Sequence, residues 1–181
     1  MLSRDASQKG LTIVELVIGL AIVALLIGLA LPTFRVWIVN TQVRSAAEAL
    51  QNGLQVARNL AVQRNTSVEF RLGTGSSWDV VMAQSGTVVQ SRPKEEGSPS
   101  VAVTVLPGTA TSKRMTFTSL GGLAAKNADG TDSMTRLNIA MATSDIVSAN
   151  AKSLSIVATK GQIKLCDTKV TDVNDPRYCF P

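Results

Sequence analysis

The chain has 181 residues, of which 45% are hydrophobic and 17% are charged, with a net charge of +5 and no histidine. This length suits one modest domain plus an appendage, and the composition excludes a disordered or a uniformly membrane-embedded chain. Histidine is the usual general base and the commonest metal ligand, and two cysteines cannot complete a structural zinc site. An enzyme is therefore a poor interpretation, and no cofactor or metal is expected. The basic balance permits contact with anionic lipid or nucleic acid without requiring it.

An apolar segment follows the short polar start of the chain. Residues 1–10 are polar, and residues 11–31 contain only Thr12 and Glu15 as polar side chains. As a helix this segment would be about 31 Å long, which matches the hydrocarbon core of a bilayer. It is too long for the apolar region of a secretory signal peptide, and no small-residue cleavage site follows it. One interpretation is a plain single-pass anchor, oriented by the positive charges that precede it.

The helical pattern continues beyond Pro32. Apolar and small residues recur at steps of three and four, which places them on one face of a helix. They are Val36, Val39, Val43, Ala46, Leu50, Leu54, Ala57 and Ala61. We predict one helix over residues 11–64, kinked near Pro32. Its first half, 11–31, is apolar all round, and its second half, 32–64, is amphipathic and must pack against another layer.

Residues 65–181 have the pattern of a β-rich head. Stretches of strand-forming residues alternate with Gly-, Pro- and Ser-rich turns. They predict strands over residues 66–72, 78–83, 88–91, 101–106, 115–118, 136–142, 154–159 and 162–166. The last two strands form a predicted hairpin, and Trp78 and Phe117 are expected in the core. The predicted fold class is α+β, with the long N-terminal helix packed on an antiparallel β-sheet.

One carboxylate, Glu15, lies within the apolar segment. If the chain is cut after Gly10, Leu11 becomes the N-terminus and Glu15 lies one helical turn further on. A carboxylate at the centre of a bilayer costs roughly 2.5–3.5 kcal/mol, and a neighbouring amine offsets that cost. In a stack of identical helices, the amine of one subunit can meet Glu15 of the next. Glu15 would then fix the register of assembly.

This N-terminal region resembles the class III signal of type IV pilins and of the pseudopilins of type II secretion. The matching residues are Lys9, Gly10, Thr12, Glu15 and Pro32. The family usually has Phe where this chain has Leu11, and Leu is a tolerated variant. The resemblance implies that a prepilin peptidase cuts between Gly10 and Leu11 and that Leu11 is N-methylated. It also implies a single-pass precursor in the inner membrane, with residues 1–10 as leader and the head in the periplasm, and later a place in a pilus at the cell surface.

The rest of the chain resembles the GspH/FimT family of minor pilins. The long helix, the strand at 66–72, the late hairpin and the closing GQIKLC carry this resemblance over most of residues 11–166. The closing Gly-x-x-x-Cys with a second Cys near the end is similar to the FimT/FimU type. This implies a minor pilin of a type IV pilus, which acts in the pilus or its tip or priming complex and supports twitching motility. The implied partners are other major and minor pilins, the prepilin peptidase and the inner-membrane assembly platform. A GspH-type minor pseudopilin of type II secretion is the alternative.

Cys166 and Cys179 would close a loop of about fourteen residues near the C-terminus. A head outside the cytoplasm places both thiols in an oxidising compartment. We therefore predict a disulfide, worth roughly 3 kcal/mol in the chain-entropy model, that ties the C-terminal residues to the last strand. Two free thiols are the alternative.

DNA binding for natural transformation is a further alternative. FimT-like minor pilins can bind DNA through a Gly-Arg-x-Arg motif in the late hairpin. The corresponding residues here are Gly161, Gln162, Ile163 and Lys164. Gln removes one positive charge, and Lys keeps a charge without the bidentate geometry of Arg. Lys160, Lys169 and Arg177 could add phosphate contacts, so weak, sequence-independent binding is the most that this pattern predicts.

The stretch KNADGTD places Asn127, Asp129 and Asp132 around Gly130. Alternating oxygen ligands around a Gly resemble the start of a calcium loop, but the distal bidentate Glu of such a loop is missing. We expect a polar turn here.

Overall fold

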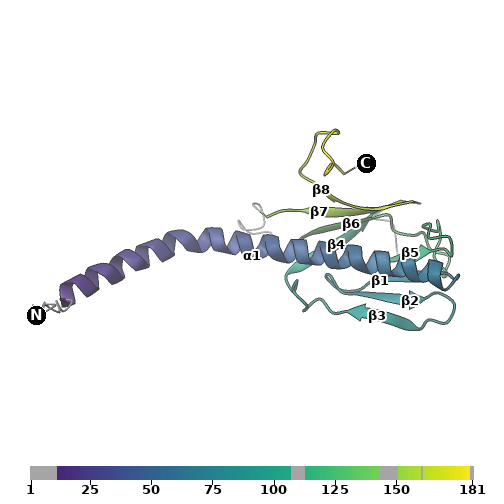
Figure 1. Ribbon diagram of the computed structural model, residues 1–181, viewed down its shortest axis with the longest axis horizontal. Coiled ribbons are helices and arrows are strands. Elements are labelled where there is room, and N and C mark those ends of the chain that lie inside the picture. The colour runs from purple at the N-terminus through teal and green to yellow at the C-terminus, as the bar shows by residue number, and fades with distance from the viewer. Residues whose placement is uncertain (1–11, 107–112, 143–150, 160, 180–181) are drawn as a thin grey trace, which may run out of the picture. The chain divides into compact units, whose positions relative to one another are not determined.

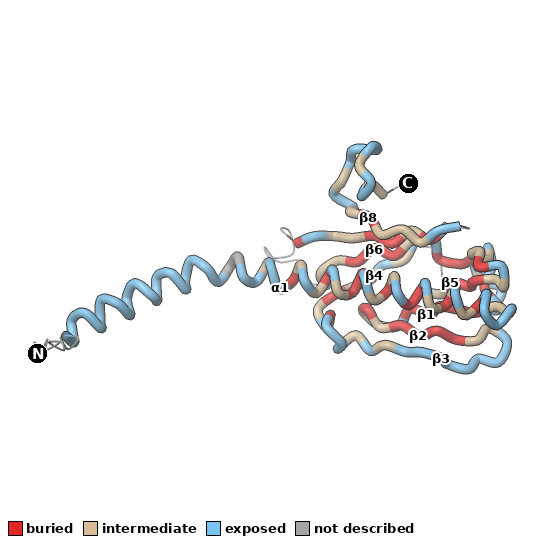
Figure 2. Tube along the Cα trace, in the orientation of Figure 1, coloured by how far each residue is buried: buried red, intermediate tan, exposed pale blue. Residues whose placement is uncertain are grey.

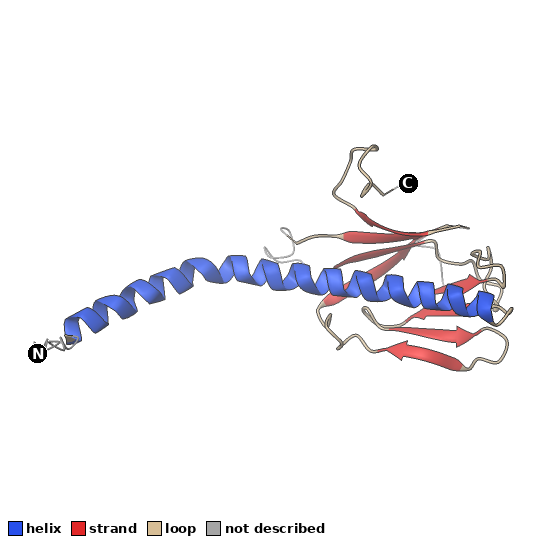
Figure 3. Cartoon of the chain, in the orientation of Figure 1, coloured by secondary structure: helices blue, strands red, loops and turns tan. Residues whose placement is uncertain are grey.

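The computed structural model describes residues 12–106, 113–142, 151–159 and 161–179 (Figure 1). The chain divides into two compact units, Met1–Arg35 and Val36–Pro181. In the described part, one helix is followed by strands only (Figure 3). The elements are α1 (Ile13–Gln63), β1 (Val68–Leu72), β2 (Trp78–Met82), β3 (Val88–Arg92), β4 (Val101–Leu106), β5 (Arg114–Phe117), β6 (Arg136–Met141), β7 (Leu154–Ala158) and β8 (Ile163–Asp167).

Both ends of α1 have capping interactions that the sequence specifies. At the start, the Thr12 hydroxyl accepts a hydrogen bond from the Glu15 backbone N–H at 3.2 Å, which is the contact of a helix N-cap. At the end, Asn65 adopts a positive φ of 47°, and the Thr66 N–H donates to the Ala61 carbonyl at 3.1 Å. This is a Schellman motif, which ends a helix by satisfying its last carbonyls. The predicted long helix is confirmed, and the predicted kink at Pro32, which lies within α1, stays a prediction.

In the first unit, the apolar part of α1 is exposed along its length (Figure 2). The fractional exposure of its large hydrophobic side chains ranges from 49% at Leu31 to 82% at Ile13. By length and composition, α1 contains a stretch that can cross a membrane. An exposed apolar surface of this size needs a cover, which lipid or other protein chains can supply.

The strands of the second unit form two four-stranded antiparallel sheets, ordered β3-β2-β1-β5 and β4-β6-β7-β8. The predicted strands and the predicted β7–β8 hairpin are confirmed, with pairing from Leu154↔Asp167 to Ala158↔Ile163. The sequence did not predict two sheets. The chain leaves the first sheet after β3, adds β4 to the second, and returns with β5 to pair with β1. Such pairing depends on contacts between distant residues and leaves no local pattern in the sequence.

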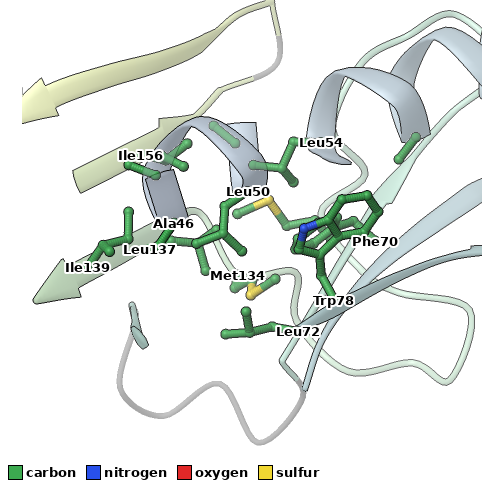
Figure 4. Close-up of a cluster of buried hydrophobic side chains, with 14 of the residues drawn as sticks. Ala46, Leu50, Leu54, Phe70, Leu72, Trp78, Met134, Leu137, Ile139 and Ile156 are labelled. Atoms are coloured by element: carbon green, nitrogen blue, oxygen red, sulfur yellow. The ribbon is translucent and has the colours of Figure 1, made fainter. Parts of the chain in front are cut away.

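The predicted apolar stripe of α1 packs against both sheets and forms the core (Figure 4). Leu50 and Leu54 are fully buried at its centre. The rings of Phe70 and Trp78 lie against this part of the helix, with centroids 5.8 Å apart and planes tilted by 31°. The expectation that Trp78 and Phe117 are core residues is confirmed, since they are 2% and 1% exposed.

Gly53 allows α1 to approach the first sheet closely. A Cβ atom built on Gly53 would lie 2.9 Å from Phe70 Cε2 and 2.9 Å from two indole carbons of Trp78. Real Cβ atoms are not found at such distances from other heavy atoms. Because both rings are buried and packed, they cannot move aside without loss of other contacts.

We predict that Gly53→Ala destabilises the protein. Ala gains about 1 kcal/mol of helix propensity over Gly, but overpacking a tight core costs about 1–3 kcal/mol. We expect a lower midpoint of urea unfolding for the full-length chain in detergent. The control is Asn52→Ala, at an exposed helix position, which should stabilise slightly through helix propensity alone. A stabilised Gly53→Ala would show that the close approach to Phe70 and Trp78 is not a constraint.

Candidate functional site

Glu15 lies in the first turn of α1, in a segment with no other charged side chain as far as Leu31. The N-terminus of a helix carries a partial positive charge, so a carboxylate is favourable at this end. Glu15 therefore has a local role at the start of the helix, where its backbone N–H donates to the Thr12 hydroxyl. Its role between subunits stays a prediction. The predicted cut and methylation, at Gly10 and Leu11, fall outside the described residues.

The predicted disulfide between Cys166 and Cys179 is confirmed, with Cα atoms 5.2 Å apart. It closes a C-terminal loop that starts at the end of β8. The Asp167 N–H donates to the Arg177 carbonyl at 2.8 Å, and Asp167 and Tyr178 form a parallel β-bridge. Residues 177–179 are thus held against β8 by backbone contacts as well as by the covalent bond, as the sequence predicted.

The candidate DNA-binding cations in this region have partners within the protein. Lys164 Nζ donates to the Tyr178 carbonyl at 3.1 Å, and Lys169 Nζ donates to the Ala151 carbonyl at 2.8 Å. Arg177 forms an ion pair with Asp175 at 2.7 Å. Lys160 lies outside the described residues. The structure therefore gives the three described cations a role in holding the C-terminal loop, and their contacts add no support to the DNA hypothesis.

Asp175 is stabilised as a carboxylate by Arg177. The Arg177 side chain donates to Asp175 Oδ1 at 3.1 Å and to Oδ2 at 2.7 Å, and the Arg177 backbone N–H donates to Oδ1 at 2.8 Å. These hydrogen bonds, the side-chain ones first, lower the pKa of Asp175 to about 2. The positive charges of Arg177 and Lys164 act in the same direction.

A buried acid, Glu69, was missed by the sequence analysis. Strand alternation places Glu69 on the face of β1 away from α1, where solvent is expected, yet it is fully buried. Arg71 donates to Glu69 Oε2 at 2.8 Å, Arg114 lies 3.8 Å from the same oxygen, and the Ala128 N–H donates to Oε1 at 3.3 Å. The contact with Ala128 shows the reason, because the loop after β5 folds back over this face of the sheet.

The polar stretch around Gly130 is part of that loop and forms a turn, as expected. Asn127 Oδ1 accepts hydrogen bonds from the Thr116 hydroxyl at 2.9 Å and the Ser133 hydroxyl at 3.0 Å. Asp129 Oδ2 pairs with Arg114 at 3.0 Å. These oxygens hold the loop on the sheet, and the described residues contain no cluster of three potential metal-ligating His, Cys, Asp or Glu side chains.

A groove of about 490 Å³ lies between α1 and the β7–β8 hairpin in the second unit. We name it the Trp37 groove. Its lining residues are Trp37, Asn40, Thr41, Arg44, Glu48, Lys152, Leu154, Leu165, Cys166, Asp167 and Arg177. The sequence alone did not predict this groove. The sequence contained one sign of it, a helix stripe of residues 37, 41, 44 and 48 that begins with an aromatic residue. The sequence did not show that the β7–β8 hairpin faces this stripe, because that depends on the tertiary structure.

These features define a pilin-type subunit, in which a long helix has a Thr12 N-cap, an acid in its first turn and an apolar first part, and in which its second part packs in a β-rich head. Residues 5–31 match the prokaryotic N-terminal methylation motif, and residues 46–161 match the family described as type II transport protein GspH. Because the second match covers more than half of the chain, the protein belongs to the GspH family, within the group of type IV pilus and type II pseudopilus subunits. This is a family of structural proteins.

The solved structures similar to this chain include two crystal forms of the type IV minor pilin FimU from Pseudomonas aeruginosa strain PAO1. In the first, the sequences are 21% identical, the TM-score is 0.48, and the match covers 68% of this chain and 87% of FimU. In the second, the identity is 20%, the TM-score is 0.45, and the coverage is 67% and 90%. A search of curated proteins found no match.

We predict that the disulfide contributes substantially to stability. Cys179→Ser removes the bridge. The two cysteines are separated by 13 positions in the sequence, and in the chain-entropy model a disulfide that closes a loop of this length stabilises the protein by roughly 3 kcal/mol. The midpoint of guanidinium unfolding should fall accordingly, and the unsubstituted protein in reductant should show the same shift. Equal midpoints for the oxidised and the Cys179→Ser proteins would contradict this prediction.

We predict that the contact between Asp175 and Arg177 weakens only in strong acid. Because folding lowers the pKa of Asp175 to about 2, the stability it contributes is complete above its ordinary pKa near 4 and is lost as the pH falls towards about 2. A carboxyl-carbon NMR titration should give the low pKa directly. In Arg177→Gln the Asp175 titration should move back towards about 4, and an unchanged value would show that Arg177 is not the cause.

Proposed function

We propose that the protein is a minor pilin of a type IV pilus, which acts in the fibre or in its tip or priming complex and supports twitching motility. The observation that carries this proposal is the exposed apolar segment of α1, which begins at the Thr12 cap and contains one acid, Glu15, in its first turn. The confirmed loop between Cys166 and Cys179 supports the pilus type over other members of the family, because the sequence resembles the FimT/FimU type at these residues.

The proposed route begins with a single-pass precursor in the inner membrane, with its head in the periplasm. A prepilin peptidase removes residues 1–10, and Leu11 is N-methylated. The apolar segment then leaves lipid for the centre of a fibre, where neighbouring helices cover its side chains in place of acyl chains. The assembly platform and other major and minor pilins are the partners in this route. Its distinct physical requirement is a cation for Glu15 in an apolar environment, which the new N-terminal amine of an adjacent subunit meets.

A second candidate function is that of a minor pseudopilin in type II secretion. The family that matches residues 46–161 is described as a type II transport protein, which favours this alternative. Deletion of the gene separates the two candidates. Loss of surface fibres and twitching with normal exoprotein release supports the pilus, whereas retention of secreted proteins with normal twitching supports the pseudopilus.

We predict that Glu15→Ala blocks assembly and leaves processing intact. Ala removes the charge that pairs with the amine, while the bond between Gly10 and Leu11 is unchanged. We expect the mature, methylated mass in membranes and a loss of this subunit from sheared fibres.

The matched control is Glu15→Gln, which keeps the shape and hydrogen-bonding capacity of the side chain but removes the charge. It should fail like Glu15→Ala if charge pairing is the requirement. Normal incorporation of both variants into fibres would reject the proposed role, and an uncut precursor in the unsubstituted strain would reject the maturation route.

A further inference from the structure

The Trp37 groove combines an apolar floor with a charged rim. Leu154 and Leu165 on the hairpin are partly buried, and Trp37 on α1 is 62% exposed. On the rim, Arg44 and Glu48 form an exposed ion pair at 2.7 Å. Trp and Arg are enriched at the centres of protein–protein interfaces, where an aromatic side chain supplies much of the binding energy. This combination suits a partner that brings an apolar side chain with a charge beside it.

The charges of the groove favour a protein over a nucleic acid. It is lined by charges of both signs, so it is not the uniformly basic surface that phosphate groups favour. The carboxylates are Glu48 and Asp167, and the cations are Arg44, Lys152 and Arg177. Arg44 and Arg177, which also line it, are each paired with a carboxylate, Glu48 and Asp175 respectively. The lining thus carries both signs of charge, as in interfaces that fix the orientation of a protein partner.

The same unit carries a second, complementary feature near the C-terminal end of α1. We name residues 118–121 the Leu120 turn. It is closed by a hydrogen bond from the Gly121 N–H to the Thr118 carbonyl at 2.8 Å, and Leu120 is 92% exposed. Gly121 has a φ of +74°, and a Cβ there would lie 3.0 Å from Val62 and 3.3 Å from Arg58. The turn therefore packs on the last turns of α1 and presents an aliphatic side chain beside an arginine.

The groove and the turn lie at different ends of the part of α1 that packs in the head. The helix wall of the groove spans residues 37–48, and the turn packs on Arg58 and Val62. Along the helix, Glu48 and Val62 are about 21 Å apart, at 1.5 Å per residue. A contact between two such different surfaces is heterologous, and it builds an open fibre when its repetition does not close into a ring.

We propose that the Trp37 groove is the docking site for the distal turn of a neighbouring pilin-type subunit. By distal turn we mean the turn that packs on the C-terminal end of that subunit's long helix and presents an exposed aliphatic side chain beside a cation. The Leu120 turn of this chain is one example. The aliphatic side chain enters between Trp37 and the hairpin leucines, and the cation meets Glu48 or Asp167. This inference rests on the proposed function, because it requires assembly with other pilin-type subunits.

Site-specific photo-crosslinking in cells that assemble the fibre tests the proposal on the full-length chain. A photoreactive amino acid replaces Thr41, an exposed residue on the helix wall of the groove. The control probe replaces Gln90, an exposed residue on the edge strand β3 of the other sheet. We expect the Thr41 probe to link to a protein that has its own prepilin-type signal, and the linked peptide to come from its distal turn. A linked peptide that contains Leu120 would identify a second copy of this chain.

Three substitutions then test the chemistry of the groove. Trp37→Ala, at an exposed position, should abolish the Thr41 crosslink. Glu48→Lys should weaken it, because it places a like charge opposite the incoming cation, and Lys152→Glu should strengthen it for the opposite reason. Both charged positions are exposed, so the fold should be unaffected. A stronger crosslink in Glu48→Lys, or a weaker one in Lys152→Glu, would overturn the proposed partner chemistry.

The outcomes also separate this proposal from the proposed function. If Glu15→Ala blocks assembly but the Thr41 probe in assembled fibres gives no crosslink, only the docking proposal fails. A crosslink to nucleic acid, or to a protein without a prepilin-type signal, would overturn it as well. If Glu15→Ala and Glu15→Gln both assemble normally, the proposed function fails, whatever the Thr41 probe shows.

Discussion

The head depends on the packing of one face of α1 against two β-sheets at once. The small side chains of Ala46, Ala57 and Ala61 let that face approach the sheets closely. Gly53 has no side chain at the point where the helix meets Phe70 and Trp78. Leu50 and Leu54 fill the centre between the sheets (Figure 4). Because one helix closes the core of both sheets, it also fixes the position of the β7–β8 hairpin beside it. The Trp37 groove is a consequence of that packing.

The two parts of α1 show how one secondary-structure element can have two environments. The second part buries a single stripe in the head, whereas the apolar side chains of the first part remain exposed (Figure 2). The distribution of apolar residues around the helix distinguishes these two parts. In the proposed fibre, neighbouring helices would cover the exposed part. The capped first turn then places Glu15 at the end where a helix favours a negative charge.

The C-terminal region is organised by several weak contacts around one covalent bond. The disulfide brings the loop back to β8, and the backbone contact between Asp167 and Arg177 extends the pairing. The ammonium groups of Lys164 and Lys169 donate hydrogen bonds to the backbone carbonyls of Tyr178 and Ala151, respectively. Cations that the sequence suggested for phosphate binding thereby make contacts within the fold. A positive charge identifies a candidate contact, but its partners in the folded chain decide whether it is available.

The sequence by itself determined the long helix, its apolar and amphipathic parts, the strand positions, the late hairpin and the pairing of its two cysteines. These features depend on local periodicity, turn residues and the presence of only two thiols. The tertiary structure decided the division into two sheets, the burial of Glu69 beneath the loop after β5, and the Trp37 groove. Each of these requires segments far apart in the chain to meet, such as β1 with β5 and α1 with the last hairpin. Side-chain patterns report which face of an element is apolar, but they do not specify which other element will cover it.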